Sequence, residues 1–307
     1  MATYKTYDTI GIREDLINAI YDISPTTTPF MSTVGRTTAK NTLHEWQTDS
    51  LAAVDLNNAQ VEGADAVSPT LTPTTRVGNY TQISDKVVQV STTDDKVDKA
   101  GRSTETAYQL SKASAELKRD MESILLSDQA QNAGGASEAS GDPMTARKLG
   151  GLGSWVTTNV VDAGAAPMTE VMLNEAVLKA YTEGGEPTMM LVSPANKQVF
   201  STFPGIAVQR YEAPKTGQTK IVGAADIYMS DFGTLSVVPD RFLGDDVAYV
   251  LDPSMAKVSY LRPFKTTKLA KTGDSEKTLM NVEYTLVVNN ELAHAKIDNI
   301  SNATPAP

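Results

Sequence analysis

The sequence predicts an α+β fold, in which a long rod-like helix precedes a helix–strand–helix insert and a series of strands. Three observations predict it. A heptad-spaced apolar row runs through residues 103–131, a short apolar segment at Met189–Val192 separates two helical patterns, and alternating apolar segments fill the C-terminal part of the chain. Because helices and strands do not alternate regularly, a βαβ chain is disfavoured.

The composition is that of an acidic chain that is large enough to bury a core. Its 307 residues allow two domains, or one domain with a long insertion, and 40% of them are apolar. Having no cysteine and two histidines excludes disulfides, thiolate metal sites, cysteine nucleophiles and poly-histidine sites. The net charge of −10 gives no overall basic footprint for nucleic acid. Since no signal peptide and no apolar run of about 18 residues occurs, we expect no membrane partner and folding in the cytoplasm.

Residues 1–45 form an N-terminal arm with hydrophobic contacts of its own. Apolar residues recur at helical spacing from Ile12 to Ile23, and Ser24-Pro25 ends that run. Proline geometry predicts that the following segment, Thr26–Met31, is extended, with Phe30 and Met31 as anchors.

Residues 46–85 form an excursion that cannot build a core. Within 47–82 there is no Ile, Met, Phe or Trp, and Pro69 and Pro73 interrupt the segment. Such a segment is either disordered or a two-stranded excursion that gains its order from outside the subunit. The alternating flanks, Leu43–Gln47 and Val77–Val90, favour the second interpretation.

Residues 103–131 predict one helix about 43 Å long. Leu110, Leu117 and Ile124 are seven residues apart, Ser103 or Thr104 can cap the start, and Asn132 with Gly134 ends it. The remaining surface of the helix is expected to be covered by charged residues: Lys112, Glu116, Lys118, Arg119, Asp120 and Glu122.

The Gly-, Ala- and Ser-rich stretch 132–153 predicts a flexible domain boundary. Beyond it, Met168–Tyr181 and a segment opened by Ser193-Pro194 are expected to be helices on either side of the strand Met189–Val192. The remaining strands are predicted at Ile227–Met229, Leu235–Val238, Val247–Leu251, Ala256–Leu261 and Leu279–Val288.

Motifs for catalysis are weak throughout the chain. Gly150–Gly153 lacks the lead-in strand and spacing of a phosphate loop, and Ser254–Lys257 lies too close to Lys271–Gly273 to enclose a penicillin-recognising domain. The acid pairs Asp94-Asp95 and Asp245-Asp246 are better interpreted as solvated loop tips than as metal sites. We therefore expect no catalytic residue, cofactor or metal. A metal-dependent hydrolase using Asp245-Asp246 is the weaker alternative.

Charge is distributed unevenly along the chain. Between Lys257 and Lys271 there are five basic residues and no acid, whereas residues 46–100 hold eight acids and four bases, a net charge of −4. These stretches are either two solvated faces or complementary surfaces on neighbouring copies, since opposite charges steer docking and fix register.

Several stretches resemble one family, the SU-ten-like major capsid proteins of tailed phages, which have the Hong Kong ninety-seven (HK97) capsid fold. The similarity runs from residue 10 to residue 297. It is carried by Ile23–Pro25, Thr28–Met31, Thr42–Leu51, Glu62–Ala66, Thr75–Ile83, Glu116–Glu122, Tyr260–Phe264 and Leu269–Lys277.

The resemblance implies a domain plan. An arm at 1–45 leads to an extended β-loop at 46–85 that lies over a neighbouring subunit. A peripheral domain at 86–149 holds the spine helix 103–131, an axial domain spans 150–250, and strands at 251–307 return to the peripheral domain. No in-chain scaffolding segment is expected. No Lys–Asn pair for cross-linking is evident either, so we expect noncovalent joints.

The function implied is that of a major capsid protein that self-assembles into hexamers and pentamers of an icosahedral head. The head would enclose double-stranded DNA, bound without sequence specificity, and would be assembled in the bacterial host cytoplasm and persist in the virion. Portal, scaffolding or decoration proteins are further partners that the resemblance allows. A decoration or tail-tube subunit is the alternative, which the long helix disfavours.

The candidate contact residues between subunits come from the loop and from the basic run. Arg262 is favoured to bind a carboxylate of a neighbour rather than the genome, because its planar fork suits a carboxylate. The candidates are Trp46, Asp49, Asp55, Glu62, Asp65, Arg76, Lys257, Arg262, Lys265, Lys268 and Lys271.

Overall fold

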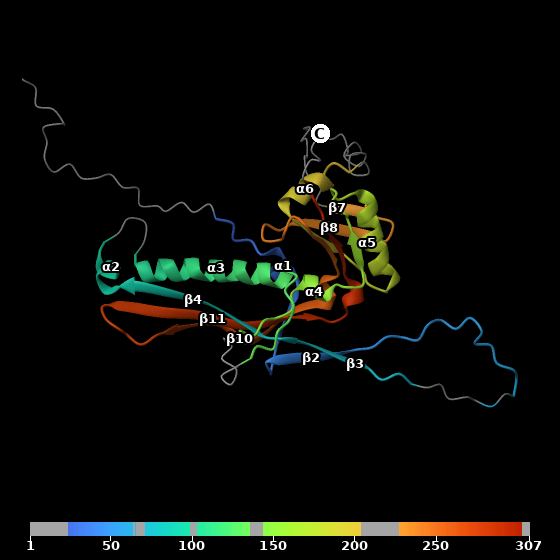
Figure 1. Ribbon diagram of the computed structural model, residues 1–307, viewed down its shortest axis with the longest axis horizontal. Helices are drawn as coiled ribbons and strands as arrows, with labels where there is room; N and C mark the ends of the chain where they lie inside the picture. Colours follow the sequence, from blue (N-terminus) through green and yellow to red (C-terminus); the bar gives the residue numbers. More distant parts are fainter. Residues whose placement is uncertain are drawn as a thin grey trace, which may run out of the picture.

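The computed structural model describes residues 24–63, 65, 71–98, 103–135, 144–203 and 227–302. A long helix lies along a long sheet, a more compact part with a second sheet stands at one end of it, and a thin two-stranded loop extends beyond that end (Figure 1). Of the helices described, none is long and apolar enough to cross a membrane.

The long sheet has four strands in the order β1-β10-β11-β4. These are β1 (Gly35–Thr38), β4 (Gln82–Ser91), β10 (Ala256–Lys268) and β11 (Ser275–Val288). The last three are antiparallel neighbours, and β1 pairs parallel to β10. The strands expected at Ala256–Leu261 and Leu279–Val288 are both present and are longer than predicted, because β10 and β11 pair as far as Lys268 and Thr278.

Helix α3 (Glu105–Leu126) is the predicted rod, and it packs on this sheet through Leu117, Met121 and Leu125, which are fully buried. Its 22 residues make it about 33 Å long, and it ends five residues before the expected Gln131. Ser127 ends it: the residue is extended, and its hydroxyl donates a hydrogen bond to the Ile124 carbonyl at 2.8 Å.

Acidic residues near α3 have roles that differ from those expected. Asp94 and Asp95 lie in the short helix α2 (Thr92–Lys96) rather than in a loop; Asp94 is exposed, as expected, whereas Asp95 accepts a hydrogen bond of 3.0 Å from the Thr106 amide in the first turn of α3. Glu122, expected on the solvent side of α3, is fully buried, because backbone amides of the arm bind its carboxyl group.

The second sheet has six strands in the order β5-β12-β9-β6-β8-β7. Its strands are β5 (Val160–Asp162), β6 (Met189–Val192), β7 (Ile227–Ser230), β8 (Gly233–Pro239), β9 (Ala248–Leu251) and β12 (Ala295–Asp298). Helices α5 (Glu170–Thr182) and α6 (Pro194–Phe200) pack into one buried cluster with Met190, Val192 and Val250 of this sheet. The opposite face of the sheet, through Leu191 and Tyr249, joins the core around α3.

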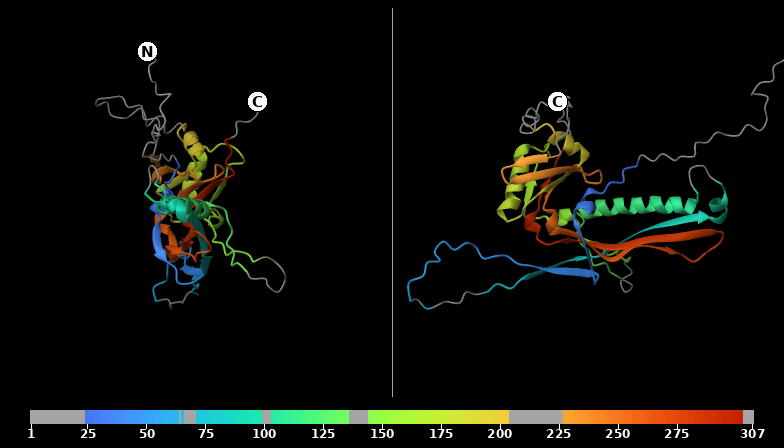
Figure 2. Two further views of the ribbon diagram at one scale, coloured as in Figure 1. Left: turned by 90° about the vertical axis from the view of Figure 1, so that its left-hand side faces the viewer. Right: turned by 180° about the vertical axis from the view of Figure 1, so that it is seen from behind.

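The predicted helices and strands of this part are confirmed within one or two residues, whereas β5 and β12 were not predicted. Strand β12 lies inside the segment 251–307 and pairs with β9 and β5. Two short 3-10 turns, η3 (Pro253–Met255) and η4 (Glu291–Ala293), precede β10 and β12 respectively. Figure 2 shows the two sheets from the side and from behind, with the loop extending from their junction.

The described part of the arm begins at Ser24, so the helical pattern Ile12–Ile23 lies outside the described residues. The expected extended conformation of Thr26–Met31 is wrong at its end, because Pro29 opens the short helix α1 (Pro29–Thr33). Phe30 and Met31 are buried anchors, as predicted.

The glycine-rich segment before helix α4 (Leu152–Trp155) is packed, not flexible. Gly150, Gly151 and Gly153 are buried, and the Gly151 and Gly153 amides donate hydrogen bonds to the Gln129 and Ser127 carbonyls. A Cβ on Gly151 would lie 2.2 Å from the Ser127 carbonyl oxygen. The glycines are therefore needed for close approach to the end of α3.

Candidate subunit-contact surface

The extended loop is built on two antiparallel strands, β2 (Leu43–Thr48) and β3 (Thr75–Tyr80). Their register runs from Leu43 opposite Tyr80 to Thr48 opposite Thr75. Beyond Thr48 the described chain leaves the body of the subunit and turns back far from it (Figure 1). The strands pair only at the base, Leu43–Thr48 with Thr75–Tyr80, and the described residues between them are not in strands.

The tip of this loop, which is the part beyond β2 and β3, exposes large apolar side chains: Leu51 is 98% exposed, Leu56 91% and Leu71 86%. Val54 and Val61 are 87% and 80% exposed. Isolated apolar side chains on a surface are ordinary, but five along one projecting segment, with no contact to the subunit's core, indicate a surface that other chains cover.

The base of the loop, in contrast, is held by three sets of contacts. Trp46 packs on Trp155 of α4, with ring centroids 5.4 Å apart. The Arg76 guanidinium binds Glu45 across the two strands through Nε at 2.7 Å and Nη2 at 2.5 Å. The Asn79 side chain, fully buried, accepts from the Gly150 amide at 2.7 Å and donates to the Leu286 carbonyl at 2.9 Å. The base therefore holds the direction of the loop while the tip stays free.

A buried carboxylate, Glu283 of β11, joins this base to the basic run. It accepts hydrogen bonds from the Thr81 hydroxyl at 2.8 Å and from Arg262 Nε at 2.7 Å, and Arg147 Nη2 makes a further ion pair with it. Burial alone would raise the pKa of Glu283, but these hydrogen bonds and the two guanidinium charges hold it below its ordinary value. Glu283 thus stays ionised at neutral pH.

The structure changes how the predicted contact residues are interpreted. Trp46 and Arg76 make the intrachain contacts described above, and Arg262 already holds a carboxylate of its own chain. Within the basic run, Lys268 pairs with Glu276 at 3.3 Å, and Lys271 donates to the Thr92 hydroxyl at 3.2 Å.

The other candidates are spread over two surfaces. Asp49, Asp55, Glu62 and Asp65 are exposed on the loop, Lys257 is half-buried at the start of β10, and Lys265 is exposed further along it. Sequence reasoning missed Glu283, Arg147 and Asn79, because most of their partners are more than 65 residues away.

The outer part of the loop and the end of the basic run lie at opposite ends of the subunit. Residues Arg262 to Lys271 follow β10 toward the end that carries α2, whereas the loop extends past the six-stranded part (Figure 1). Within one subunit these two charged surfaces therefore cannot meet.

A hollow of about 480 Å³ lies beside the basic run, between α1, α3 and β10. Tyr260, Pro263 and Phe264 form its apolar side, while Arg36 and Lys118 contribute positive charge. The hollow therefore combines an apolar wall with two positively charged side chains, near the middle of the long sheet.

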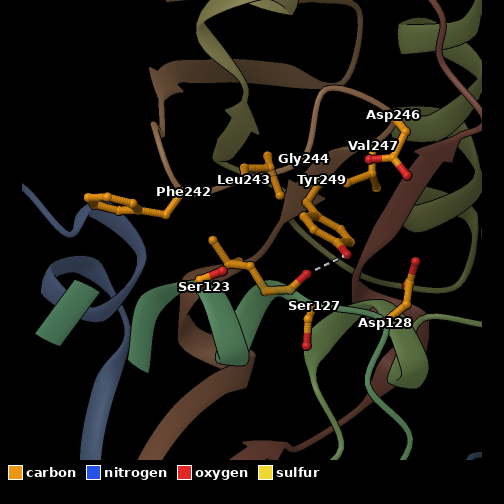
Figure 3. Close-up of a pocket in the computed structure, with 10 residues that line it drawn as sticks. Ser123, Ser127, Asp128, Phe242, Leu243, Gly244, Asp246, Val247 and Tyr249 are labelled. Carbon is orange, nitrogen blue, oxygen red and sulfur yellow. Dashed lines mark hydrogen bonds between the residues drawn. The ribbon is translucent and has the colours of Figure 1, made fainter. Parts of the chain in front are cut away.

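A second, smaller pocket of about 200 Å³ lies where the end of α3 meets the six-stranded sheet (Figure 3). The Tyr249 hydroxyl donates to the Leu126 carbonyl at 2.8 Å, and burial raises its pKa above the ordinary value. Asp128 and Asp246 lie at the rim, and Asp245 is exposed next to them. Among the described residues no group of three or more acidic or histidine side chains is placed to hold a metal ion, so the hydrolase alternative gains no support there.

The family model for SU10 major capsid proteins matches residues 2–301 of the chain. The chain belongs to this family. A major capsid protein of Escherichia phage Phieco32 is 30% identical over 326 residues, covering 91% of this chain and 92% of that relative. The SU10-family chain is accordingly a phage major capsid protein and a component of the virion, and the decoration and tail-tube alternatives are set aside.

Solved structures confirm the HK97-like fold of this SU10-family protein. The holo-SrpI encapsulin complex from Synechococcus elongatus PCC 7942 has a TM-score of 0.60 at 15% identity, covering 97% of this chain and 99% of that chain. The capsid of a native GTA particle has a TM-score of 0.64 at 9% identity, with coverages of 96% and 98%. A chain from Gordonia phage Cozz has a TM-score of 0.62 at 12% identity, with coverages of 95% and 92%.

Proposed function

We propose that this major capsid protein self-assembles into hexamers and pentamers of an icosahedral head that encloses double-stranded DNA. In this proposal each subunit lays its loop, residues 46–85, over a neighbour. The peripheral and axial parts of the shell are formed by residues 86–149 and 150–250. The protein acts without catalysis, and its joints are noncovalent.

The proposal rests on one observation. The tip of the loop carries exposed apolar side chains, whereas its base is held in place by contacts with the rest of the subunit. Full burial of one Leu or Val side chain is worth about 1.5–3 kcal/mol, and five such side chains on the tip have no partner in the subunit's core. Since the base fixes the direction of the loop, little orientational freedom is lost when the tip binds. A shell supplies a neighbour to every tip.

Charge supports the same arrangement. The acids Asp49, Asp55, Glu62 and Asp65 are at the loop end, and exposed Lys265 and Lys268 are at the other end of β10. Such pairs are worth only about 0–1 kcal/mol each, but they fix register and are repeated at every copy of the contact. We infer that the basic run faces a neighbouring subunit rather than the genome.

The direct test removes residues 52–72 from the loop. The variant should keep the parent's circular dichroism spectrum and melting temperature, because the tip contributes nothing to either core. It should fail to form shells in electron micrographs. A variant that assembles as well as the parent overturns the proposed role of the loop.

A finer version changes side chains only. Replacing Leu51 by Ser together with Leu56 by Ser should impair assembly, whereas Val171→Ser, at a side chain of α5 that is 75% exposed, removes exposed apolar area outside the loop and is the control. Hydrogen exchange should show slow exchange over 49–63 in shells and fast exchange in free subunits. Equal protection in the two states contradicts the proposal.

A further inference from the structure

Two acidic side chains of the core, Glu122 in α3 and Asp240 just after β8, are fully buried side by side. They come from different parts of the subunit, the long helix and the six-stranded part, and no function described above uses them. Charged groups are almost never fully buried without an ionic partner, so the pair requires an explanation.

A third element, the arm, meets the pair. Glu122 Oε1 accepts a hydrogen bond from the Phe30 amide at 2.6 Å, and Oε2 accepts one from the Met31 amide at 3.0 Å. These amides belong to the first turn of α1, where backbone donors have no partner within the helix. The arm is therefore attached to α3 by these two polar contacts as well as by the packing of Phe30 and Met31 in the core.

Asp240 accepts a hydrogen bond from the turn that follows it, and its side chain also lies beside Glu122. Its Oδ1 accepts the Phe242 amide at 2.9 Å, and its backbone amide donates to the Val192 carbonyl at 2.8 Å. Its Oδ2 is buried, and no N–H or hydroxyl among the described residues donates to it. If both carboxyls were ionised, two acceptors would face each other in a dry site. One proton between the two carboxyl groups lets one of them donate a hydrogen bond to the other, which two carboxylates cannot do.

Among the described residues, no cation neutralises the pair instead. On α3, the Arg119 guanidinium lies over the Phe242 ring, 5.5 Å from its centroid, and Arg241 beside Asp240 is exposed. In the described part of the chain neither arginine makes an ion pair with these carboxyls. Helix α1 and strands β6 and β9 contain no charged residue. Burial accordingly raises the pKa of Glu122 to about 8, against the opposing effect of the two amides, and also raises the pKa of Asp240.

We propose that Glu122 and Asp240 form a proton-operated clamp, in which one shared proton holds the arm, the long helix and the six-stranded part together and its loss releases the arm. With the proton present, Glu122 binds two arm amides and Asp240 at once. Without it, two negative charges repel each other in a site that water cannot screen, and opening the α1 contact lets water reach them.

The direction of the pH dependence follows from linkage. The closed state holds the proton more tightly than the open or unfolded state, in which a Glu has its ordinary pKa of 4.5. The clamp is thus fully effective below that value and is lost as the pH rises through about 8. Within this window the equilibrium constant for opening increases up to about tenfold per pH unit for one shared proton.

Asp240→Asn is the most informative variant. The Asn Oδ1 can still accept the Phe242 amide, and its NH₂ group can donate to Glu122, which then stays a carboxylate bound by three donors. Hydrogen exchange of the full chain, corrected for intrinsic rates, should show peptides covering 29–33 losing about tenfold protection between pH 7 and pH 9 in the parent. Asp240→Asn should keep that protection. Asp245→Asn, an exposed carboxyl of the same segment, should behave like the parent.

Peptides covering β9 report on general alkaline unfolding and should stay protected throughout. Equal losses in the parent and in Asp240→Asn overturn the clamp. Should Asp240→Asn not fold, infrared spectroscopy of the parent decides the matter. A protonated-carboxyl band present at pH 7 and gone by pH 9 supports the shared proton, and its absence at pH 7 overturns it.

Discussion

Replacing Gly151 by Ala tests whether the glycine-rich segment is a packed joint between α3 and α4. A Cβ at this position would lie 2.2 Å from the Ser127 carbonyl oxygen and 2.9 Å from the Ile124 carbonyl oxygen. Both are backbone atoms at the end of α3, so no side-chain rotation can relieve the overlap. The φ of Gly151 is −77°, which alanine adopts without strain, so any effect comes from packing.

The expected cost has two parts. Overpacking of a rigid site costs about 1–3 kcal/mol. Moving the segment away also weakens two buried hydrogen bonds, from the Gly151 amide to Gln129 at 2.9 Å and from the Gly153 amide to Ser127 at 3.2 Å, each worth about 1 kcal/mol. We therefore expect the free energy of unfolding to fall by about 2–5 kcal/mol.

Urea unfolding of the isolated subunit measures this change, with Gly135→Ala as the control. The nearest atom to a Cβ on Gly135 is the Thr145 hydroxyl oxygen at 3.8 Å, an ordinary contact, so the control should stay within about 0.5 kcal/mol of the parent. If Gly151→Ala unfolds at the parent's midpoint, the segment is the flexible boundary that its composition suggests, and the packing described here is wrong.

Three further changes test the core and the base of the loop. Leu117→Ala, in the fully buried row of α3, should cost about 2–5 kcal/mol in urea unfolding, and exposed Lys112→Ala on the same helix about 0.5 kcal/mol or less. Arg262→Ala should cost no more than about 1 kcal/mol, because Thr81 and Arg147 still hold Glu283, yet should hinder assembly of empty shells; normal empty shells with poor DNA retention would point to the genome instead. Because the pKa of Glu283 is lowered, its contribution is lost as the pH falls below 4.5, so Glu283→Gln should flatten the acid side of the stability curve.

The elements that the sequence predicted are those with a local cause. The heptad row of α3, the proline that opens α6 and the run of four apolar residues in β6 each identify their element without reference to the rest of the chain. The end of α3 was misplaced because Ser127, whose hydroxyl caps the Ile124 carbonyl, was not recognised as a stop signal, and its further contact with the Gly153 amide follows from no local rule.

The buried carboxyl groups show the same limit of prediction from sequence more clearly. Glu122 occupies a position of α3 that composition assigns to solvent, and nothing near it in the chain says otherwise. Its partners are the amides of residues 30 and 31 and the carboxyl of residue 240, about 90 and 118 residues away. The short parallel pair β5 and β12 was likewise invisible, since three residues paired with a strand 136 positions later leave no periodic trace.

The placement of the loop has a consequence for the symmetry of assembly. The tip extends from one end of the subunit, and the basic part of β10 lies toward the other, so a contact between them joins unlike surfaces of two copies. Such a head-to-tail assembly leaves one loop tip and one basic surface without a partner each time a subunit is added. It ends only when the copies close into a ring, or else continues as an open filament. A two-fold dimer could pair each tip with the basic surface of the other copy only if the two subunits lay antiparallel to each other. The five- and six-membered rings of the proposed assembly would use every tip, and an outstretched, apolar loop whose exposed side chains lie outside the subunit's core suits such rings.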